Sequence, residues 1–142
     1  MVEKTRRRDE VTIYCTHAVE KIFEAWNRHD LDVMMDNFSD DMIRIGASGT
    51  RYDKKGMLED IAWFLSIFPD ARTRVDRMVS QGYAVWVEFI ITGTHKKELF
   101  GIPATDKEIE IPGVWILDFE DSKVKLCKEY WNHRRLMLEL SE

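Results

Sequence analysis

The first third of the chain repeats its apolar positions at helical spacing. Between residues 9 and 28, apolar side chains recur every three or four positions with charges between them, which predicts an amphipathic helix. A shorter helix is expected from Asp30, a favoured N-cap residue, to Asn37. A third helix is expected to begin at Asp53, after a short strand over 42–45 and a glycine-containing turn.

After residue 70 the apolar residues instead occupy alternate positions, which is the pattern of strands. The predicted strands span 71–80, 83–92, 108–119 and 123–131. Gln81-Gly82 is expected to turn the first strand into the second, and Pro112-Gly113 to form a bulge inside the third. A short closing helix is predicted over 134–140. Helices followed by a mostly antiparallel sheet predict an α+β fold.

The pattern contains no repeat, low-complexity segment or linker, so residues 1–142 are expected to form one domain. Residues 1–8 are expected to be a flexible or frayed N-terminal arm. Lys and Arg number 21 and Asp and Glu 26, a net charge of −5, which disfavours a nucleic-acid partner. The sequence shows no apolar run long enough for a membrane span and no signal-peptide core, so a cytoplasmic location without membrane contact is expected. The two cysteines have no CxxC spacing and are expected to be buried, reduced thiols.

Alternation along the two longest strands assigns their side chains to two faces of the sheet. The face expected to meet the helices carries Val85, Val87, Phe89, Ile91, Ile109, Ile111, Trp115, Leu117 and Phe119. On the opposite face, Trp86, Ile90 and Ile116 would expose apolar surface to water. An exposed apolar face of this kind indicates a partner, most simply a second copy of the chain, so a homodimer through the sheet is expected.

Several short motifs occur in an order that resembles a known family. They are Phe68-Pro69-Asp70, Gly93-Thr94-His95, Gly101-Ile102-Pro103-Ala104-Thr105, and Tyr130-Trp131 followed by Leu136 and Glu139-Leu140. In this order and spacing, over residues 18 to 140, the chain resembles SnoaL-like polyketide-cyclase-type proteins of the superfamily that contains nuclear transport factor 2 and ketosteroid isomerase. The resemblance implies a cone-shaped barrel: a curved sheet wraps one side, helices close the other, and an apolar cavity lies between them.

The resemblance also implies a small-molecule pocket, with an Asp near the end of the last strand as acid or base in cyclase-type members. Here Tyr130-Trp131 is followed by Asn132, an amide that forms hydrogen bonds but does not titrate near neutral pH. One interpretation is cofactor-independent cyclisation, isomerisation or dehydration next to a carbonyl of a small apolar substrate. The other is a non-catalytic ligand-binding or interaction protein, for which the missing acid is no loss. The roles known for ketosteroid isomerase do not carry over, because Ile22, Gly46 and Gly113 stand where its reactive side chains would be.

Four residues are candidates for chemistry, each with an alternative. Asn132 would orient a substrate oxygen. His133 titrates in the useful range, but strand alternation turns it away from the Asn132 face unless the strand has already ended. Glu88 is a candidate base if it points inward and a surface or interface charge if it points outward, which alternation favours. His95 is either catalytic or, more simply, a hydrogen-bonding structural residue.

The side chains expected to line the cavity and bind the substrate are Trp63, Val87, Phe89, Trp115 and Tyr130. The four histidines lack the short pairings of metal ligands, and no acids recur at ligand spacing, so no metal is expected. The sequence also lacks GxGxxG, a P-loop and GxSxG, and no cofactor is expected.

Overall fold

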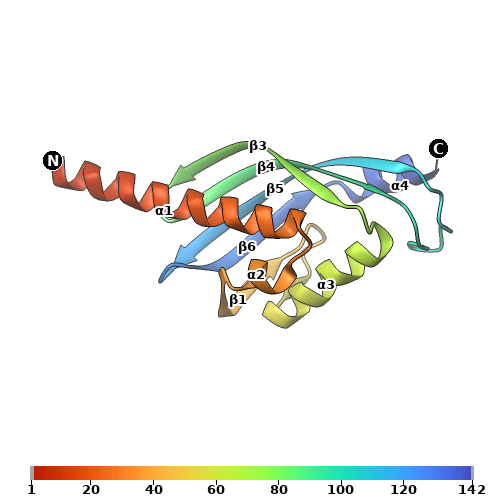
Figure 1. Cartoon of the computed structure of the whole chain (residues 1–142), viewed down its shortest axis with the longest axis horizontal. Helices are drawn as coiled ribbons and strands as arrows, with labels where there is room; N and C mark the ends of the chain where they lie inside the picture. Colours follow the sequence, from red (N-terminus) through yellow and green to blue (C-terminus); the bar gives the residue numbers. More distant parts are fainter. Residues whose placement is uncertain (1, 142) are drawn as a thin grey trace.

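A sheet and four helices make up residues 2–141, the part of the chain that the computed structural model describes (Figure 1). The helices are α1 (Val2–Asn27), α2 (Leu31–Met35), α3 (Lys54–Ile67) and α4 (His133–Ser141). The strands are β1 (Phe38–Ile45), β2 (Arg51–Tyr52), β3 (Arg72–Gln81), β4 (Ala84–Thr94), β5 (Glu108–Glu120) and β6 (Lys123–Trp131). The predicted α+β class is confirmed.

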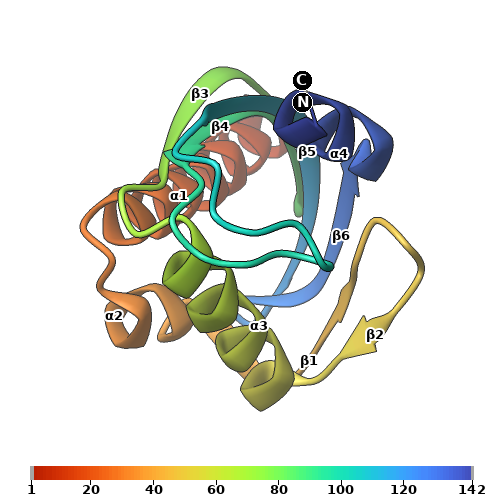
Figure 2. The same ribbon diagram turned by 90° about the vertical axis from the view of Figure 1, so that its right-hand side faces the viewer.

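All six strands belong to one sheet in the order β2-β1-β6-β5-β4-β3. Every neighbouring pair is antiparallel except β1 and β6, which run parallel. Figure 2 shows the sheet curving around one side while α1, α2 and α3 lie on the other, and the segment between β4 and β5 crosses in front of them. The sheet does not close on itself, so the cone is an open one.

The helices begin where short acidic side chains cap them. The Asp30 carboxylate accepts a hydrogen bond from the Val33 N–H at 3.3 Å, and Asp53 accepts one from the Gly56 N–H at 2.7 Å. Both predicted helix starts are therefore confirmed, since these acceptors satisfy N–H groups that have no partner within the helix.

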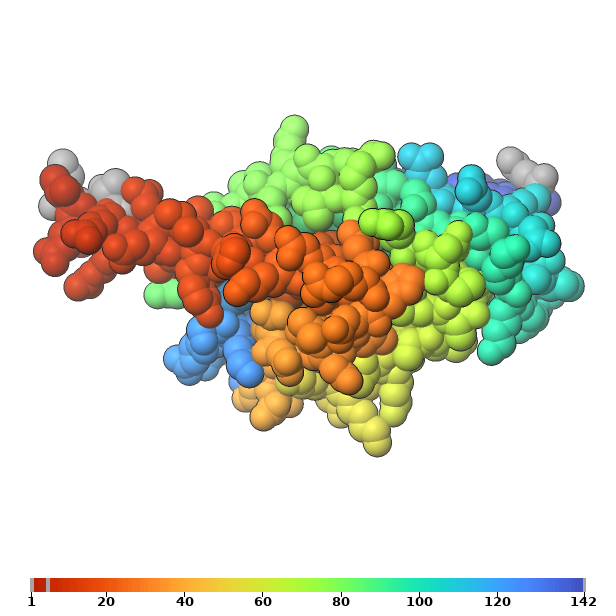
Figure 3. Space-filling view, in the orientation of Figure 1, coloured from red at the N-terminus to blue at the C-terminus, as the bar shows by residue number. Residues whose placement is uncertain are grey.

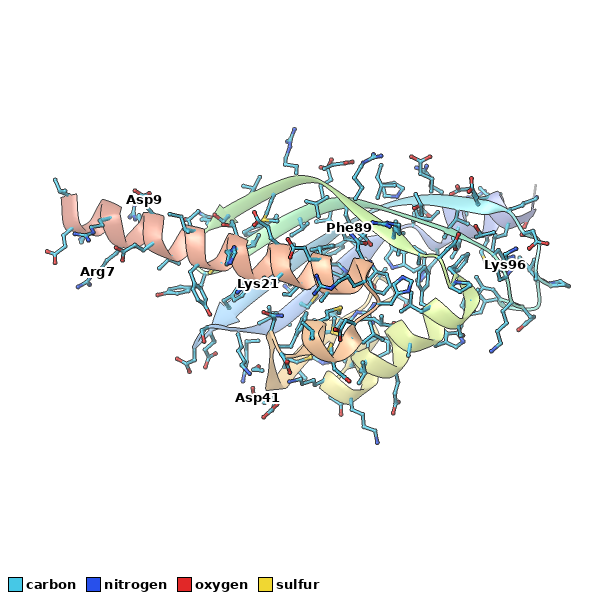
Figure 4. The ribbon with its side chains drawn as sticks, viewed as in Figure 1. Arg7, Asp9, Lys21, Asp41, Phe89 and Lys96 are labelled. Carbon is cyan, nitrogen blue, oxygen red and sulfur yellow. The ribbon has the colours of Figure 1, made fainter. Side chains whose placement is uncertain are left out.

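The first helix is longer than its apolar pattern predicts. It begins at Val2, so residues 2–8, expected as a frayed arm, are helical, while residue 1 lies outside the described residues. This end of α1 projects beyond the sheet, as the space-filling view and the labelled Arg7 and Asp9 show (Figures 3 and 4). The apolar pattern starts only where α1 first meets the sheet, and the charged turns before it extend into solvent.

The bulge expected at Pro112-Gly113 is absent. β5 pairs with β4 without interruption there, with Ile90 opposite Pro112 and Phe89 opposite Gly113. Pro112 is tolerated because β5 pairs with β6 only from Gly113 onward, so the missing N–H leaves no bond unmade on that side. Gly113 is needed for another reason: a Cβ at this position would lie 2.8 Å from the Phe89 ring.

The uninterrupted register places one set of side chains of β4 and β5 toward the helices. Val85, Val87, Phe89, Ile109, Ile111, Trp115, Leu117 and Phe119 are all buried, and Ile91 is partly buried. Phe89, labelled in Figure 4, packs against Phe23 of α1 with ring centroids 5.8 Å apart. The predicted inner face is confirmed, and it forms the floor of the site described next.

Candidate functional site

A cavity of about 420 Å³ opens between the inner face of the sheet, α1, α3 and the segment after β4. Its floor is apolar and aromatic, from side chains of α1, β4 and β5. These buried residues are Phe23, Trp26, Phe89, Ile109, Ile111 and Trp115. Phe23, Phe89 and Trp115 contact one another through tilted and edge-on rings, with centroids 5.5 to 6.0 Å apart. Such a floor favours a largely apolar ligand.

Three charged side chains interrupt this apolar lining at one place. The Arg44 guanidinium is buried and bonds two acids that also line the cavity. Its Nη1 donates to Asp60 Oδ2 at 2.6 Å, and its Nη2 donates to Glu129 Oε2 at 2.7 Å. We call Arg44, Asp60 and Glu129 the charged cluster.

The fold brings these three residues together from separate elements. In the parallel β1–β6 ladder, Arg44 pairs with Cys127, and Glu129 lies two residues further along β6 on the same face. Asp60 comes from α3, three residues after the buried Met57, so it lies on the face of the helix that packs inward. One helix and two strands therefore fix the geometry of the charged cluster.

Glu129 has both carboxylate oxygens engaged. Oε2 receives Arg44, and Oε1 accepts a hydrogen bond from the Trp115 indole N–H at 3.0 Å. Asp60 differs, because within residues 2–141 its Oδ1 has no hydrogen-bond partner and its side chain is 28% exposed against 12% for Glu129. Asp60, which lines the cavity, therefore keeps one carboxylate oxygen available for a further partner, whereas both oxygens of Glu129 are bonded.

Arg44 is charged and incompletely satisfied. Burial lowers its pKa, but the charges of Glu129 and Asp60 outweigh burial, and the pKa is raised above the ordinary arginine value. The guanidinium lies 5.0 Å from the Tyr52 ring centroid, a cation–π distance. Its Nε is buried and has no hydrogen-bond partner in the described part of the chain, which is costly unless a water or ligand atom reaches it.

With one cation and two acids, the ionised cluster carries a formal charge of −1 inside an apolar cavity. A carboxylate with one free oxygen can accept a proton from a bound molecule, and its neighbouring guanidinium keeps it oriented while it does so. An anionic ligand would meet repulsion here, whereas a neutral ligand with a hydroxyl or carbonyl would find both acceptors and a donor.

The cavity opens through a rim of exposed side chains. Ser48, Trp63, Phe100 and His133 line the cavity and are all exposed, in contrast to the buried floor. The Trp63 and Phe100 rings lie 6.0 Å apart between centroids. Access to the charged cluster therefore passes an aromatic entrance.

Asn132 caps the last helix and does not line the cavity. Its Oδ1 accepts a hydrogen bond from the Arg135 N–H at 3.2 Å, and the side chain is exposed. His133 is the first residue of α4; it lies on the cavity rim with its ring 3.9 Å from that of Trp131 between centroids. β6 ends at Trp131, which releases His133 from strand alternation.

The two other candidates for chemistry lie away from the cavity. Glu88 is exposed on the outer face of β4, beside a surface hollow that Trp86 and Val79 also line. His95 is fully buried; its Nδ1 lies 2.9 Å from the Thr105 hydroxyl and accepts a hydrogen bond from the Thr105 N–H at 3.2 Å, and its Nε2 has no hydrogen-bond partner among residues 2–141. His95 and Thr105 connect the two ends of the segment between β4 and β5.

Three of the five expected wall residues line the cavity: Trp63, Phe89 and Trp115. Val87 is fully buried on the inner face but not in the cavity wall. Tyr130 is 54% exposed on the outer face, because the alternation of β6 turns Glu129 and Trp131 inward in its place.

The sequence contained signals for the charged cluster that its apolar pattern obscured. Asp60 lies three residues after Met57 and four before Phe64, so a charge occupies the apolar face of the predicted third helix. Arg44 lies two residues after Met42 in the first predicted strand, on the same face. A charge at a position that should be buried indicates either a paired structural ion or a functional site.

Cys15 and Cys127 are buried free thiols, as expected, and burial raises the pKa of both. Within residues 2–141, no three His, Cys, Asp or Glu side chains are grouped as metal ligands would be. No helix in the described part of the chain is both long and apolar enough to cross a membrane.

Comparison with solved structures shows the same fold in several proteins. AclR from Streptomyces galilaeus, described as a candidate hydroxylase, is 25% identical with a TM-score of 0.81, and the match covers 94% of this chain and 86% of AclR. IdmH from Streptomyces antibioticus, described as a candidate polyketide cyclase, is 20% identical with a TM-score of 0.82, over 90% and 99% of the two chains. An LEH-like epoxide hydrolase of M. tuberculosis is 14% identical with a TM-score of 0.72, over 91% and 90%.

The last two likenesses lie below 25% identity and show the fold alone. Comparison with curated proteins gives no match. The family model for the SnoaL-like polyketide cyclase matches residues 16–140, which include the floor, the rim and all three residues of the charged cluster. This chain therefore belongs to the SnoaL-like polyketide cyclase family.

Proposed function

We propose that the protein binds a small, largely apolar, uncharged molecule and catalyses acid–base chemistry next to one of its carbonyl groups without a cofactor. The proposal keeps the reaction class expected from the sequence but assigns the proton transfer to a residue outside the four candidates named from the sequence. Asp60 takes that role. The observation that carries it is the free Oδ1 of Asp60 at the cavity wall, on a carboxylate held by the buried Arg44.

In this scheme the Asp60 carboxylate accepts a proton from the carbon next to the ligand's carbonyl. The electron pair of that C–H bond moves into the enolate. In an isomerisation Asp60 returns the proton to another carbon of the enolate; in a ring closure the enolate carbon attacks a second carbonyl of the ligand and Asp60 gives the proton to the oxygen of that carbonyl; in a dehydration the enolate expels a β-hydroxyl, which takes the proton and leaves as water. Arg44 orients Asp60, and Glu129 balances the Arg44 charge. The aromatic floor supplies the apolar contacts.

Deuterium exchange tests this chemistry without knowledge of the natural substrate. 2-Tetralone is neutral, largely apolar and smaller than the cavity, and its protons next to the carbonyl are acidic. In D₂O we expect the protein to accelerate the loss of their NMR signals. Asp60→Asn should slow the exchange by about 100-fold, the lower end of the usual contribution of a general base.

Glu59→Gln is the matched control, because Glu59 is the exposed neighbour of Asp60 on α3. It should leave the exchange rate unchanged. If the protein binds neutral aromatic probes but accelerates no exchange, and Asp60→Asn changes nothing, the acid–base proposal is wrong and the ligand-binding alternative stands.

The outer face of the sheet supports a second part of the proposal, a homodimer. Trp86 is 38% exposed and Val79 53% exposed, on neighbouring strands that bear the hollow beside Glu88. Apolar surface of this kind on the open face of a sheet is costly in water. A second copy of the same face would cover it, as an isologous interface does.

A further inference from the structure

A hydroxyl group lies among the buried side chains that line the cavity. It belongs to Thr73 of β3, which is 6% exposed and lies in a row with Ile91 and Ile111, its neighbours across the sheet. All three residues line the cavity. Thr73 is the one buried residue of β3, so the side chain that this strand turns inward is polar. A buried hydroxyl is costly unless it forms hydrogen bonds, which raises the question of its partners.

The backbone that carries this hydroxyl is fixed from two sides. The Thr73 N–H donates to Asn27 Oδ1 at 2.8 Å, and Asn27 Nδ2 donates to the Thr73 carbonyl at 2.9 Å. Asn27 is the last residue of α1, so these two bonds tie the strand to the end of the helix. On its other side Thr73 pairs with Ile91 of β4. A β-branched side chain on such a backbone has few rotamers, so the hydroxyl is preorganised.

The Thr73 hydroxyl accepts a hydrogen bond and keeps its own hydrogen to donate. The Trp26 indole N–H donates to Thr73 Oγ1. An indole N–H can only donate, so the hydroxyl hydrogen points away from Trp26. Within residues 2–141, Thr73 Oγ1 donates to no acceptor. Trp26 and Thr73 both line the cavity, so their bond lies at the cavity wall and the free hydrogen can turn toward a ligand.

This donor lies some distance from the charged cluster, along the inner side of α3. Phe64 comes one helical turn after Asp60, about 6 Å along the helix, and both line the cavity. The Phe64 ring lies 6.4 Å from the Trp26 ring between centroids, and Trp26 bonds Thr73. Asp60 and the Thr73 hydroxyl are therefore on the order of 10 Å apart. The cavity offers a free acceptor oxygen at one end of this span and a free donor at the other.

We infer that Thr73 is a specificity-determining residue whose hydroxyl donates a hydrogen bond to a second oxygen of the ligand. That oxygen is an acceptor, such as a carbonyl or ether oxygen, on the order of 10 Å from the group that meets Asp60. A ligand without it leaves the Thr73 hydrogen unpaired and binds more weakly. The inference rests on the proposed ligand-binding function of the cavity and adds the position of a second polar group of the ligand to it.

Two probes that differ in one oxygen test the inference. 6-Acetyl-2-naphthol has a hydroxyl at one end for Asp60 and a carbonyl at the other for Thr73, and 6-ethyl-2-naphthol lacks the carbonyl oxygen. Isothermal titration calorimetry at neutral pH gives the ratio of their dissociation constants. The wild-type protein should bind the ketone about fivefold more tightly, the usual scale of one neutral hydrogen bond. Thr73→Val should abolish this preference, and Thr73→Ser should keep it.

The ratio also separates binding from a structural role of Thr73. Thr73→Val leaves the Trp26 N–H without its acceptor and should lower the unfolding temperature. Trp26→Phe removes the same bond but keeps the hydroxyl, so it should lower the unfolding temperature and weaken both probes alike, with the preference retained. Thr92→Val is the matched control, because Thr92 is an exposed threonine of β4. It should change neither quantity. Binding of the neutral fluorophore N-phenyl-1-naphthylamine, which has no oxygen, checks that each variant keeps its cavity.

The outcomes distinguish this inference from the proposal on which it rests. If the wild-type protein binds neither naphthol nor the fluorophore, the ligand-binding function of the cavity fails, and the inference fails with it. If it binds both naphthols equally well, the cavity binds ligands and the role of Thr73 is refuted. A preference for the ketone that survives in Thr73→Val, with a lower unfolding temperature, would show that Thr73 only anchors Trp26. Because the wild-type ratio is decisive by itself, the test does not depend on the folding of any variant.

Discussion

The two faces of the β4–β5–β6 region distribute charge and apolar surface in opposite ways. The inner face buries aromatic and aliphatic side chains, yet it also carries Glu129, which with Arg44 and Asp60 forms a charged cluster at the cavity wall. The outer face meets solvent, yet it leaves Trp86 and Tyr130 exposed. Charge is costly inside and apolar surface is costly outside, so each face retains an unfavourable feature.

This difference underlies the two proposals, one for each face. A buried charge that is paired but keeps a free acceptor fits a small polar group entering from the cavity. An exposed apolar surface fits a large partner that covers it. Glu129 and Tyr130 are adjacent in sequence, and the alternation of one strand places them on these two different faces.

Arg44→Met should produce the largest effect, because it removes the only cation of the charged cluster and leaves two acids in a buried setting. We expect a loss of about 3 kcal/mol in the free energy of unfolding at pH 8, measured with urea. Without Arg44 the folded-state pKa of the acids would rise, so protonation relieves the penalty and the loss should be smaller at pH 5.

Arg51→Met is the control for that change, since Arg51 is exposed on β2 and should contribute less than about 0.5 kcal/mol. A loss that is equally small for Arg44→Met would mean that the cluster is hydrated rather than buried.

Trp86→Arg should produce the next largest effect, on the outer face. A central aromatic residue of an interface contributes about 2 kcal/mol, so the dimer dissociation constant should rise by roughly 30-fold. Sedimentation velocity over a concentration series measures this. Val33→Arg makes the same kind of change at an exposed apolar residue of α2 and should leave association intact. A wild-type protein that is monomeric at micromolar concentration would exclude the sheet-face dimer.

Glu129→Gln should reduce the free energy of unfolding less than Arg44→Met does, and it tests the part of Glu129 in the charged cluster. Gln can still accept the Trp115 N–H, and the remaining Arg44–Asp60 pair is neutral overall. We expect a loss of about 1 kcal/mol in unfolding free energy, with binding of N-phenyl-1-naphthylamine retained. A loss as large as that of Arg44→Met would show that Glu129, rather than the balance of charge, dominates the cluster.

Asn132→Asp should have the smallest effect, because Asn132 belongs to neither face. At this exposed N-cap position the helix N-terminus would favour the charged form of Asp, so the folded-state pKa would lie below the ordinary Asp value of about 3.9. That contribution is present above the unfolded-state pKa and is lost only as pH falls through the folded-state pKa, so pH 5 and pH 8 should give equal stabilities within about 0.5 kcal/mol. A selective loss in thermal stability at pH 8 would instead mean that the side chain enters the cavity.

The spacing of apolar residues along the sequence predicted many of the helices and strands, but it did not predict the charged cluster. The starts at Asp30 and Asp53, the strand over 123–131 and the inner faces of β4 and β5 follow from local capping and alternation, which act over a few residues. The charged cluster depends on the parallel pairing of β1 with β6 and on the packing of α3 against β1. Neither contact is local in sequence, so no single segment predicts it.

The family pattern placed the expected acid at Asn132, whereas the acid that faces the cavity from β6 is Glu129. Reading an acid position onto Asn132 would require the side chain after Trp131 to point inward, but Trp131 itself lines the cavity and β6 ends there. The inward acid is Glu129, two residues before Trp131 and on the same face. Once one residue of β6 is known to face the cavity, alternation identifies Glu129 as another that does.

The rate at which a reagent labels each of the two buried thiols measures how often the surrounding structure opens. A disulfide reagent attacks the thiolate, and the raised pKa and burial of Cys15 and Cys127 prevent attack in the closed state. The labelling rate of each thiol is therefore set by the opening that exposes it: by the rate of opening when the reagent is fast, and by the equilibrium population of the open state when the reagent is slow. Cys15 reports separation of α1 from the sheet, and Cys127 reports opening of the β1–β6 ladder beside Arg44. Two labelling rates, resolved by mass spectrometry, would tell whether helix and ladder open as one cooperative unit or as two.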